Sequence, residues 1–153
     1  MVLVGDGQYR QKLEARAQAH GLGDRVCFKG QLTAGDPVRN QLDLADIFIL
    51  PSHQEGLPRA MVEAMARALP CIGSTVGGIP ELLLPQDMVS PGDVAALACK
   101  IHEVVTDPQR MAQMSARNLE KAKEYRDEVI RPQRNEFYRY VREMTETWLR
   151  QKN

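Results

Sequence analysis

The segment HQEGLPRAMVEAMARALP, residues 53–70, carries two glutamates, Glu55 and Glu63, in a run otherwise rich in Ala, Met, Val and Leu. An apolar composition on nearly every side is typical of a helix buried in a protein core. Pro58 suits the first turn of that helix, where a backbone N–H has no helical partner. We expect little solvent to reach Glu63 because its neighbours are apolar: Leu57, Ala60, Met61, Val62, Ala64, Met65, Ala66, Ala68 and Leu69.

Strand and helix patterns alternate on both sides of this segment. Helical spacing predicts helices at 9–20 and 37–46, and short apolar runs predict strands at 2–4, 25–30, 47–52, 71–73 and 88–90. Repeated strand–helix units of this kind predict an α/β fold with a Rossmann-like, doubly wound parallel sheet. Because the chain opens directly on the run at 2–4, which has the pattern of a core strand, we expect a segment to be missing upstream.

The last third of the chain is expected to be helical. Asp93 is predicted to cap one helix, and Asp107 followed by Pro108 is predicted to begin the next, since aspartate is a frequent N-cap and proline is frequent at the first helical position. A long charged helix then runs to the end of the chain. It carries an apolar stripe made of Phe137, Val141, Met144 and Trp148. The pattern indicates one domain with a helical C-terminal tail.

Composition narrows the class of protein. Twenty basic and twenty acidic residues give a net charge of zero, which argues against a general nucleic-acid surface or a polybasic membrane surface. Cys27, Cys71 and Cys99 stand far apart in apolar surroundings, without C-x-x-C spacing, and are expected to be reduced packing residues. No apolar run approaches the ~18 residues of a membrane helix, and no signal peptide is recognisable, so we expect a soluble, cytosolic chain.

Two motifs are rejected. VGDGQYR, residues 4–10, looks like a dinucleotide fingerprint, but Arg10 stands in place of the third glycine and Asp6 would repel a pyrophosphate. A structural turn is the better interpretation. Ser52 and His53 are adjacent, and neighbouring side chains of an extended chain point to opposite sides, so we do not expect a nucleophile–base pair.

The strongest candidate site follows the strand at 47–52. Residues at the end of a parallel strand lie at the carboxyl edge of the sheet, where open α/β folds bind ligands. Free backbone amides of Leu57, Arg59 and Ala60 at the start of the next helix are expected to hold an anion there. The carboxylate of Glu55, just before that helix, is expected to accept hydrogen bonds from a polyol.

Glu63 has two interpretations from the residues alone. Arg59 and Arg67 stand four residues before and after it, so the three side chains could form an ion-paired, solvated stripe. The alternative is a carboxylate kept for a function. The neighbouring sequence helps to decide between these two interpretations of Glu63, because EGLPRAMVEAMARALP is followed closely by STVGGIPELL.

This ordered set of motifs resembles a known family. Glu55 and Glu63 in E-x7-E spacing, with PSHQEG at the start and VGGIPELL after them, resemble the donor-binding half of family 4 glycosyltransferases of the GT-B fold. The resemblance extends upstream through VGDGQYRQKLEARAQAHGLGDRVCFKG and downstream through SPGDVAALACKIHEVVTDPQRMAQMS, and covers roughly residues 1–125. It implies a nucleotide-sugar donor-binding domain at 1–125, one half of a GT-B fold with its first strand missing, and a C-terminal helix of that domain at 126–153.

The resemblance implies a role for each matched position. Three would face the transferred sugar: Glu55, Gly56 and Leu57. Five would face the nucleotide, with a carboxylate on the ribose hydroxyls, amides near the diphosphate and a loop near the base: Glu63, Arg59, Ala60, Gly30 and Gln31. The family further implies a nucleotide-diphosphate sugar as donor substrate, no cofactor, no metal and retention of the anomeric configuration. It has no obvious protein nucleophile, so no catalytic residue is assigned.

The sequence departs from the family in two ways. Pro58 stands where many members have glycine, which removes one amide donor. The arginine and lysine that hold the diphosphate in the family, and its N-terminal acceptor domain, have no counterpart here. We therefore expect a donor-domain fragment, inactive on its own, of a cytoplasmic enzyme whose acceptor is unknown. Peripheral attachment of the full-length protein to the cytoplasmic membrane face stays open.

Other functions and partners also stay open. A sugar-nucleotide epimerase shares the two-domain fold, but is not expected to combine E-x7-E spacing with EGLPRAMVEAMA. A non-catalytic nucleotide-binding module is the other alternative. In the family the end of the chain packs on the N-terminal domain. Without that cover, the stripe on the last helix is expected to contact a second copy of the chain, to fray, or to fold back onto this domain's own sheet.

Overall fold

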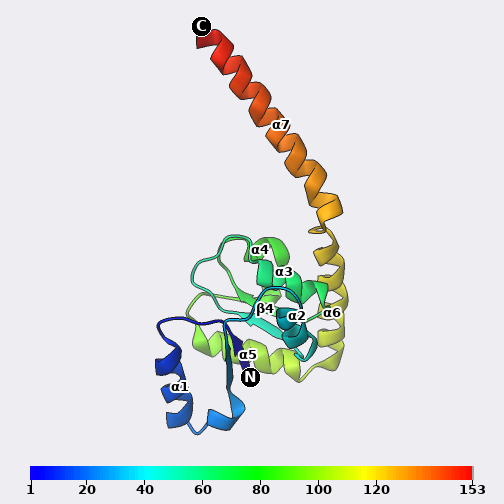
Figure 1. Ribbon diagram of the computed structural model, residues 1–153. Coiled ribbons are helices and arrows are strands. Elements are labelled where there is room, and N and C mark those ends of the chain that lie inside the picture. The colour runs from blue at the N-terminus through cyan, green and yellow to red at the C-terminus, as the bar shows by residue number, and fades with distance from the viewer. Residues whose placement is uncertain (153) are drawn as a thin grey trace. The chain divides into compact units, whose positions relative to one another are not determined.

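The computed structural model describes residues 1–152. The chain divides into two compact units, Met1–Leu44 and Ala45–Asn153. Each unit contains a parallel β-sheet and helices (Figure 1). The predicted α/β class with parallel strands is therefore confirmed, and the strands of the described residues form two sheets.

The first unit begins with a strand and ends with a helix. Its elements are β1 (Val2–Val4), α1 (Arg10–Ala19), the 3-10 helix η1 (Gly23–Arg25), β2 (Cys27–Gly30) and α2 (Asp36–Asp43). The two strands pair in parallel, with Leu3 opposite Phe28, and the register then shifts so that Val4 lies opposite Gly30. The backbone N–H of Gly5 donates to the carbonyl of Gly30 at 2.8 Å, which closes the end of this small sheet.

The prediction that residues 2–4 form a core strand is half right. The strand exists, but its side chains are exposed, with Val2 at 51% and Leu3 at 36% of their full accessibility. A sheet of two strands has little area to bury, and α1 contributes no buried residue to cover it. An apolar run thus predicted the strand correctly and its burial wrongly.

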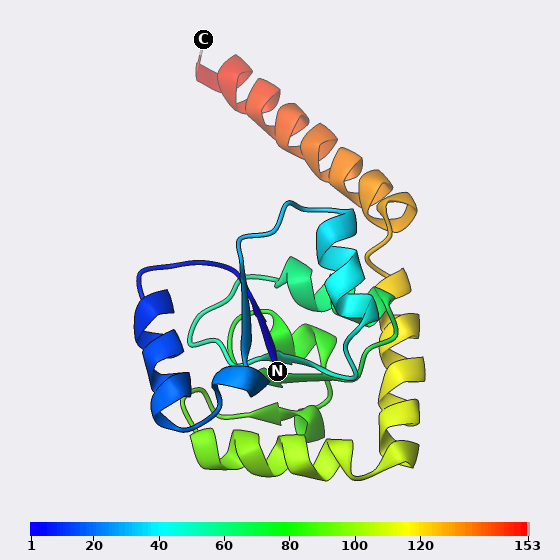
Figure 2. The ribbon, with the colours of Figure 1, turned by 60° about the horizontal axis from the view of Figure 1, so that its bottom comes forward.

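The second unit holds the larger sheet. Its elements are β3 (Phe48–Leu50), α3 (Arg59–Ala66), β4 (Cys71–Ser74), α4 (Ile79–Leu82), the 3-10 helix η2 (Pro85–Asp87), β5 (Met88–Val89), α5 (Val94–Val105), α6 (Pro108–Lys123) and α7 (Asp127–Lys152). The strands run parallel in the order β3–β4–β5, with Ile49 opposite Ile72 and Gly73 opposite Met88. Helix α3 packs on α6, and α5 packs on β5 and α6 (Figure 2).

The core of the second unit is centred on β4, all four residues of which are buried. Ile72 packs with Val104 of α5 and Met114 of α6, and each is at most 2% exposed. Gly73 allows α4 to approach the strand, because a Cβ atom there would lie 2.8 Å from Cγ2 of Ile79. The hydrophobic effect thus fixes β4 as the centre on which the neighbouring strands and helices assemble.

Both predicted helix caps are confirmed. The carboxylate of Asp93 accepts a hydrogen bond from the N–H of Ala96 at 2.9 Å, and that of Asp107 accepts one from the N–H of Arg110 at 2.9 Å. Pro108 follows in the first turn of α6, as expected. These local hydrogen bonds explain why α5 and α6 begin where the sequence predicted.

The cysteines are free, but the prediction that all three are packing residues is wrong. Cys71 is buried in β4, and desolvation raises the pKa of its thiol to about 12. Cys27 and Cys99 are exposed. Cys27 lies on the sparsely covered sheet of the first unit, and Cys99 lies on α5 away from the buried Val104, so apolar neighbours in sequence did not indicate burial.

Helix α7 differs from the rest of its unit, because none of its residues is buried. The stripe at Phe137, Val141, Met144 and Trp148 is 41–60% exposed. The alternative in which this helix folds back onto the sheet is therefore not what the structure shows, and contact with a second copy stays a prediction. Among the described residues, no helix combines the length and apolar character needed to span a bilayer.

Candidate functional site

The loop between β3 and α3, residues 51–58, lies at the carboxyl edge of the second unit's parallel sheet, as predicted. This loop contains the three residues predicted to face the transferred sugar: Glu55, Gly56 and Leu57. Pro58 is buried and extended, with φ −76° and ψ 107°, and is the N-cap residue of α3. It therefore precedes the first helical turn, which begins at Arg59, whereas the sequence had placed it inside that turn.

A hydrogen bond within the loop holds the carboxylate of Glu55. The hydroxyl of Ser52 donates to Oε1 of Glu55 at 2.7 Å. The hydroxyl of Ser74, fully buried at the end of β4, donates to the backbone carbonyl of Ser52. The hydroxyl of Ser52 thus donates to Glu55 and not to its neighbour His53.

A second loop fixes the backbone of the first. The N–H of Gly78 donates to the carbonyl of Gly56 at 2.8 Å. Gly77 has φ +53°, and a Cβ atom there would overlap with the carbonyl oxygen of Glu55. Glycine meets both requirements, the left-handed conformation and the close approach. This is the structural reason for the two glycines in VGGIPELL.

The expectation that Glu63 is buried is wrong. Met61, Ala64 and Met65 form the buried face of α3, whereas Glu63 is exposed. A helix of period 3.6 can bury one face and leave the other in water even when its small apolar residues surround the whole axis. Glu63 is not among the charged groups that form an ion pair within the described residues, so the alternative of an ion-paired stripe with Arg59 and Arg67 is not supported either.

The start of α3 offers unpaired donors. Leu57, Arg59 and Ala60 are exposed, and their backbone N–H groups form no hydrogen bond within the described part of the chain. The first N–H groups of a helix lack helical partners and attract anions. Glu63 lies one turn further along, about 6 Å from Arg59 along the helix axis at 1.5 Å per residue. A single segment therefore carries, in order, the carboxylate of Glu55, the free amides at the start of α3 and the exposed carboxylate of Glu63.

The remaining two predicted positions lie in the other unit. Gly30 has φ +68° and is buried, and Gln31, which follows it, is exposed. Their place near a nucleotide base stays a prediction from the resemblance. Within residues 1–152, His, Cys, Asp and Glu form no group of three or more that could hold a metal ion.

A small cavity of about 220 Å³ lies beside the candidate loop, at the same edge of the sheet. His53 and Pro51 line it from the loop, and Gly92 and Leu97 line it from the segment around the start of α5. No local sequence pattern indicates this cavity. Gly92, with φ +79°, lets the imidazole of His53 approach closely, since a Cβ atom there would lie 3.1 Å from Cε1.

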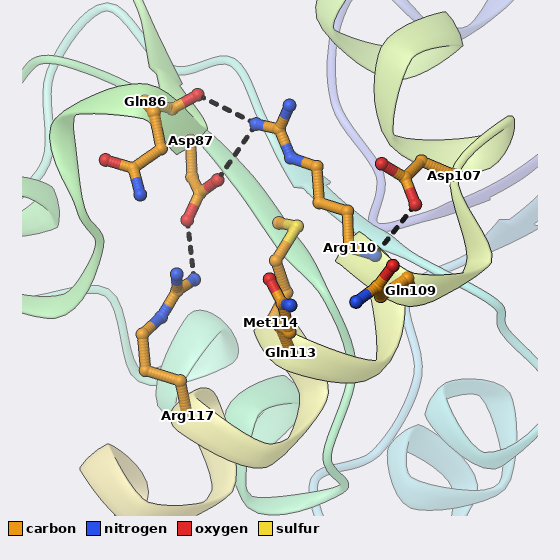
Figure 3. A pocket seen from close by; sticks show the side chains of 8 residues that line it. All are labelled: Gln86, Asp87, Asp107, Gln109, Arg110, Gln113, Met114 and Arg117. Carbon is orange, nitrogen blue, oxygen red and sulfur yellow. Dashed lines mark hydrogen bonds and ion pairs between the residues drawn. The ribbon is translucent and has the colours of Figure 1, made fainter.

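A larger polar pocket, of about 420 Å³, lies between η2 and α6 and was also missed (Figure 3). Asp87, only 1% exposed, lies at its base. Arg110 reaches Asp87 at 3.3 Å and Arg117 reaches it at 2.5 Å. The two arginines are seven residues apart, which places them on one face of α6. Both arginines donate to Asp87, and Arg110 also donates to Glu103 of α5 and to the carbonyl of Gln86, so this network joins η2 to α5 and α6.

The parallel α/β arrangement, with its candidate loop at the carboxyl edge, is that of a GT-B glycosyltransferase domain. A family model described as "Glycosyl transferases group 1" matches residues 1–122. The chain belongs to this family.

Curated relatives agree with this assignment. N-acetyl-alpha-D-glucosaminyl L-malate synthase of Bacillus anthracis is 33% identical over 143 residues, 90% of this chain and 36% of that protein. 2-Deoxystreptamine N-acetyl-D-glucosaminyltransferase of Streptomyces fradiae is 36% identical over 111 residues, 71% of this chain and 26% of that protein. The chain thus spans about a third or less of the length of these relatives.

Solved structures share the fold. Sucrose-phosphate synthase from Thermosynechococcus elongatus has a TM-score of 0.82 and 30% identity, over 92% of this chain and 38% of that one. Anabaena Alr3699/HepE in complex with UDP-glucose has a TM-score of 0.74 and 26% identity, over 80% of this chain and 35% of that one. The resemblance of the sequence motifs to GT-B glycosyltransferases, and the fold that it implied, are confirmed.

Proposed function

We propose that this chain binds the donor of a retaining glycosyltransferase, a nucleotide-diphosphate sugar whose sugar is transferred to an acceptor that the chain does not identify. The observation that carries the proposal is the loop at 51–58, in which Glu55 is held by Ser52 and by the Gly77–Gly78 backbone beside the free amides that open α3. Family membership supports the reaction class.

Each part of the loop has a chemical role in this proposal. The carboxylate of Glu55 accepts hydrogen bonds from hydroxyls of the donor sugar, with Gly56 and Leu57 beside it. The amides at Arg59 and Ala60 hold the diphosphate, whose negative charge the helix N-terminus stabilises. In the proposed enzyme these amides stabilise the negative charge of the leaving diphosphate, and no metal ion is needed for this.

In this proposal Glu63 binds the hydroxyl groups of the ribose. Two adjacent hydroxyls match the two oxygens of one carboxylate, and a charged acceptor makes the stronger kind of hydrogen bond. Its exposure supports this role, because the carboxylate is accessible and has no side-chain partner among the described residues. Desolvation of Glu63 therefore accompanies donor binding and is not present beforehand.

The relatives support a nucleotide sugar and leave the acceptor open. Anabaena Alr3699/HepE has been solved with UDP and with UDP-glucose. The acceptors named for relatives range from malate to 2-deoxystreptamine, so the family does not indicate one acceptor for this chain. The base and the sugar of the donor are likewise open.

Titration calorimetry with UDP and UDP-glucose tests the proposal on the wild type, Glu55→Ala and Glu63→Gln. Loss of a charged hydrogen bond should weaken binding of both ligands to Glu63→Gln by about tenfold or more. Glu55→Ala should keep its affinity for UDP and lose the preference for UDP-glucose. The matched control is Glu136→Gln, on the exposed α7. Equal affinities in all four proteins would refute the proposed roles.

A further inference from the structure

We infer that Ser52 is a positioning residue that holds the carboxylate of Glu55 in place for the donor sugar, an inference that rests on the proposed function. Its hydroxyl donates to Oε1 at 2.7 Å. Within the described residues, Oε2 accepts no hydrogen bond. A carboxylate has about four acceptor sites, so the bond to Ser52 occupies one and leaves the others for hydroxyl groups of a ligand.

Ser52 is itself held from the core. Its backbone carbonyl accepts a hydrogen bond from the hydroxyl of Ser74, which is fully buried at the end of β4. Strand β4 is the most deeply buried element of the sheet, with every residue buried. Ser74 of β4 therefore holds the main chain of Ser52, and the hydroxyl of Ser52 holds the carboxylate of Glu55. Through these two hydrogen bonds the buried strand restrains an otherwise flexible glutamate side chain.

The backbone beside Glu55 is fixed independently. Gly78 donates to the carbonyl of Gly56 at 2.8 Å, and the backbone of Gly77 packs against the carbonyl of Glu55. With the main chain held by the two glycines, the remaining freedom of Glu55 lies in its side chain. The hydroxyl of Ser52 removes that freedom before a ligand arrives, and preorganisation of this kind strengthens binding by reducing the ordering that binding requires.

The test compares Ser52→Ala, Ser52→Thr and the control Ser90→Ala, an exposed serine after β5. Two readouts are used on the full chain: the ¹³C resonance of the Glu55 carboxyl carbon, and affinities for UDP and UDP-glucose. Ser52→Ala should shift the Glu55 resonance, keep UDP affinity and weaken UDP-glucose binding by about threefold to tenfold, the worth of one hydrogen bond. Ser52→Thr retains a hydroxyl and should restore both readouts.

Three outcomes would overturn the inference. A Glu55 resonance unmoved in Ser52→Ala would show that the hydrogen bond does not hold the carboxylate. Unchanged UDP-glucose affinity, or an equal loss in Ser90→Ala, would show that the bond does not serve the sugar. A wild type that binds UDP and UDP-glucose equally, while the resonance still moves in Ser52→Ala, would instead refute the sugar role proposed for Glu55 and this inference with it.

Discussion

Two carboxylates of the second unit, Asp87 and Glu63, have opposite environments. Asp87 is 1% exposed and shared by Arg110 and Arg117 from α6. Glu63 is exposed on the outer face of α3 and has no ion pair within residues 1–152. A buried charge must be paired where it stands, so Asp87 holds the fold together, whereas an exposed carboxylate without a partner is available for a ligand.

The largest expected effect is that of Asp87→Asn. Removing the charge leaves Arg110 and Arg117 without their shared partner, and the free energy of unfolding should fall by about 3 kcal/mol, near the lower end for buried pairs because the arginines are partly exposed. Urea unfolding followed by circular dichroism measures it. Glu136→Gln, on exposed α7, is the control and should change little. Equal stabilities of the two variants would remove the contrast between Asp87 and Glu63.

A smaller effect is expected at Gly77, whose backbone supports the candidate loop. Gly77→Ala forces an alanine to φ +53° and against the carbonyl of Glu55, so the free energy of unfolding should fall by about 2 kcal/mol. Preference for UDP-glucose over UDP should fall as well. Gly7→Ala is the matched control, because a Cβ atom at Gly7 meets no atom within 4 Å. If both alanine variants behave alike in urea unfolding, the interlocked loops do not hold Glu55.

The smallest expected effect is that of Trp148→Ala. Trp148 is 53% exposed on a helix with no buried residue, so the free energy of unfolding should change by less than about 0.5 kcal/mol. Acrylamide should quench its fluorescence freely in dilute protein, and it is the chain's one tryptophan. Protection from quenching that increases with protein concentration would show that a second copy covers the stripe.

Local patterns predicted much of the fold. Asp93 and Asp107 cap helices because an N-cap needs only residues three positions away. The apolar run at β4 became the buried centre of the sheet. The place of Glu55 at the carboxyl edge followed from strand direction, which the alternation of strands and helices already implies. In each case the required information lies within a few residues.

The missed features depend on contacts between distant residues. Asp87 meets arginines that lie 23 and 30 positions away, and no local pattern pairs them. Exposure of Glu63 depends on which face of α3 packs inward, and small apolar residues on both faces hide that choice. The need for glycine at Gly77 arises only when its loop meets Glu55, more than twenty residues earlier in the chain.

We propose that Glu63 serves a ligand and Asp87 serves the fold, and one paired measurement tests this contrast. UDP affinity by calorimetry and the free energy of unfolding in urea are measured for Glu63→Gln and Asp87→Asn under conditions where both remain folded. We expect Glu63→Gln to bind UDP about tenfold or more weakly at unchanged stability, and Asp87→Asn to lose about 3 kcal/mol of stability at unchanged affinity. A Glu63→Gln variant with wild-type affinity for UDP would contradict it.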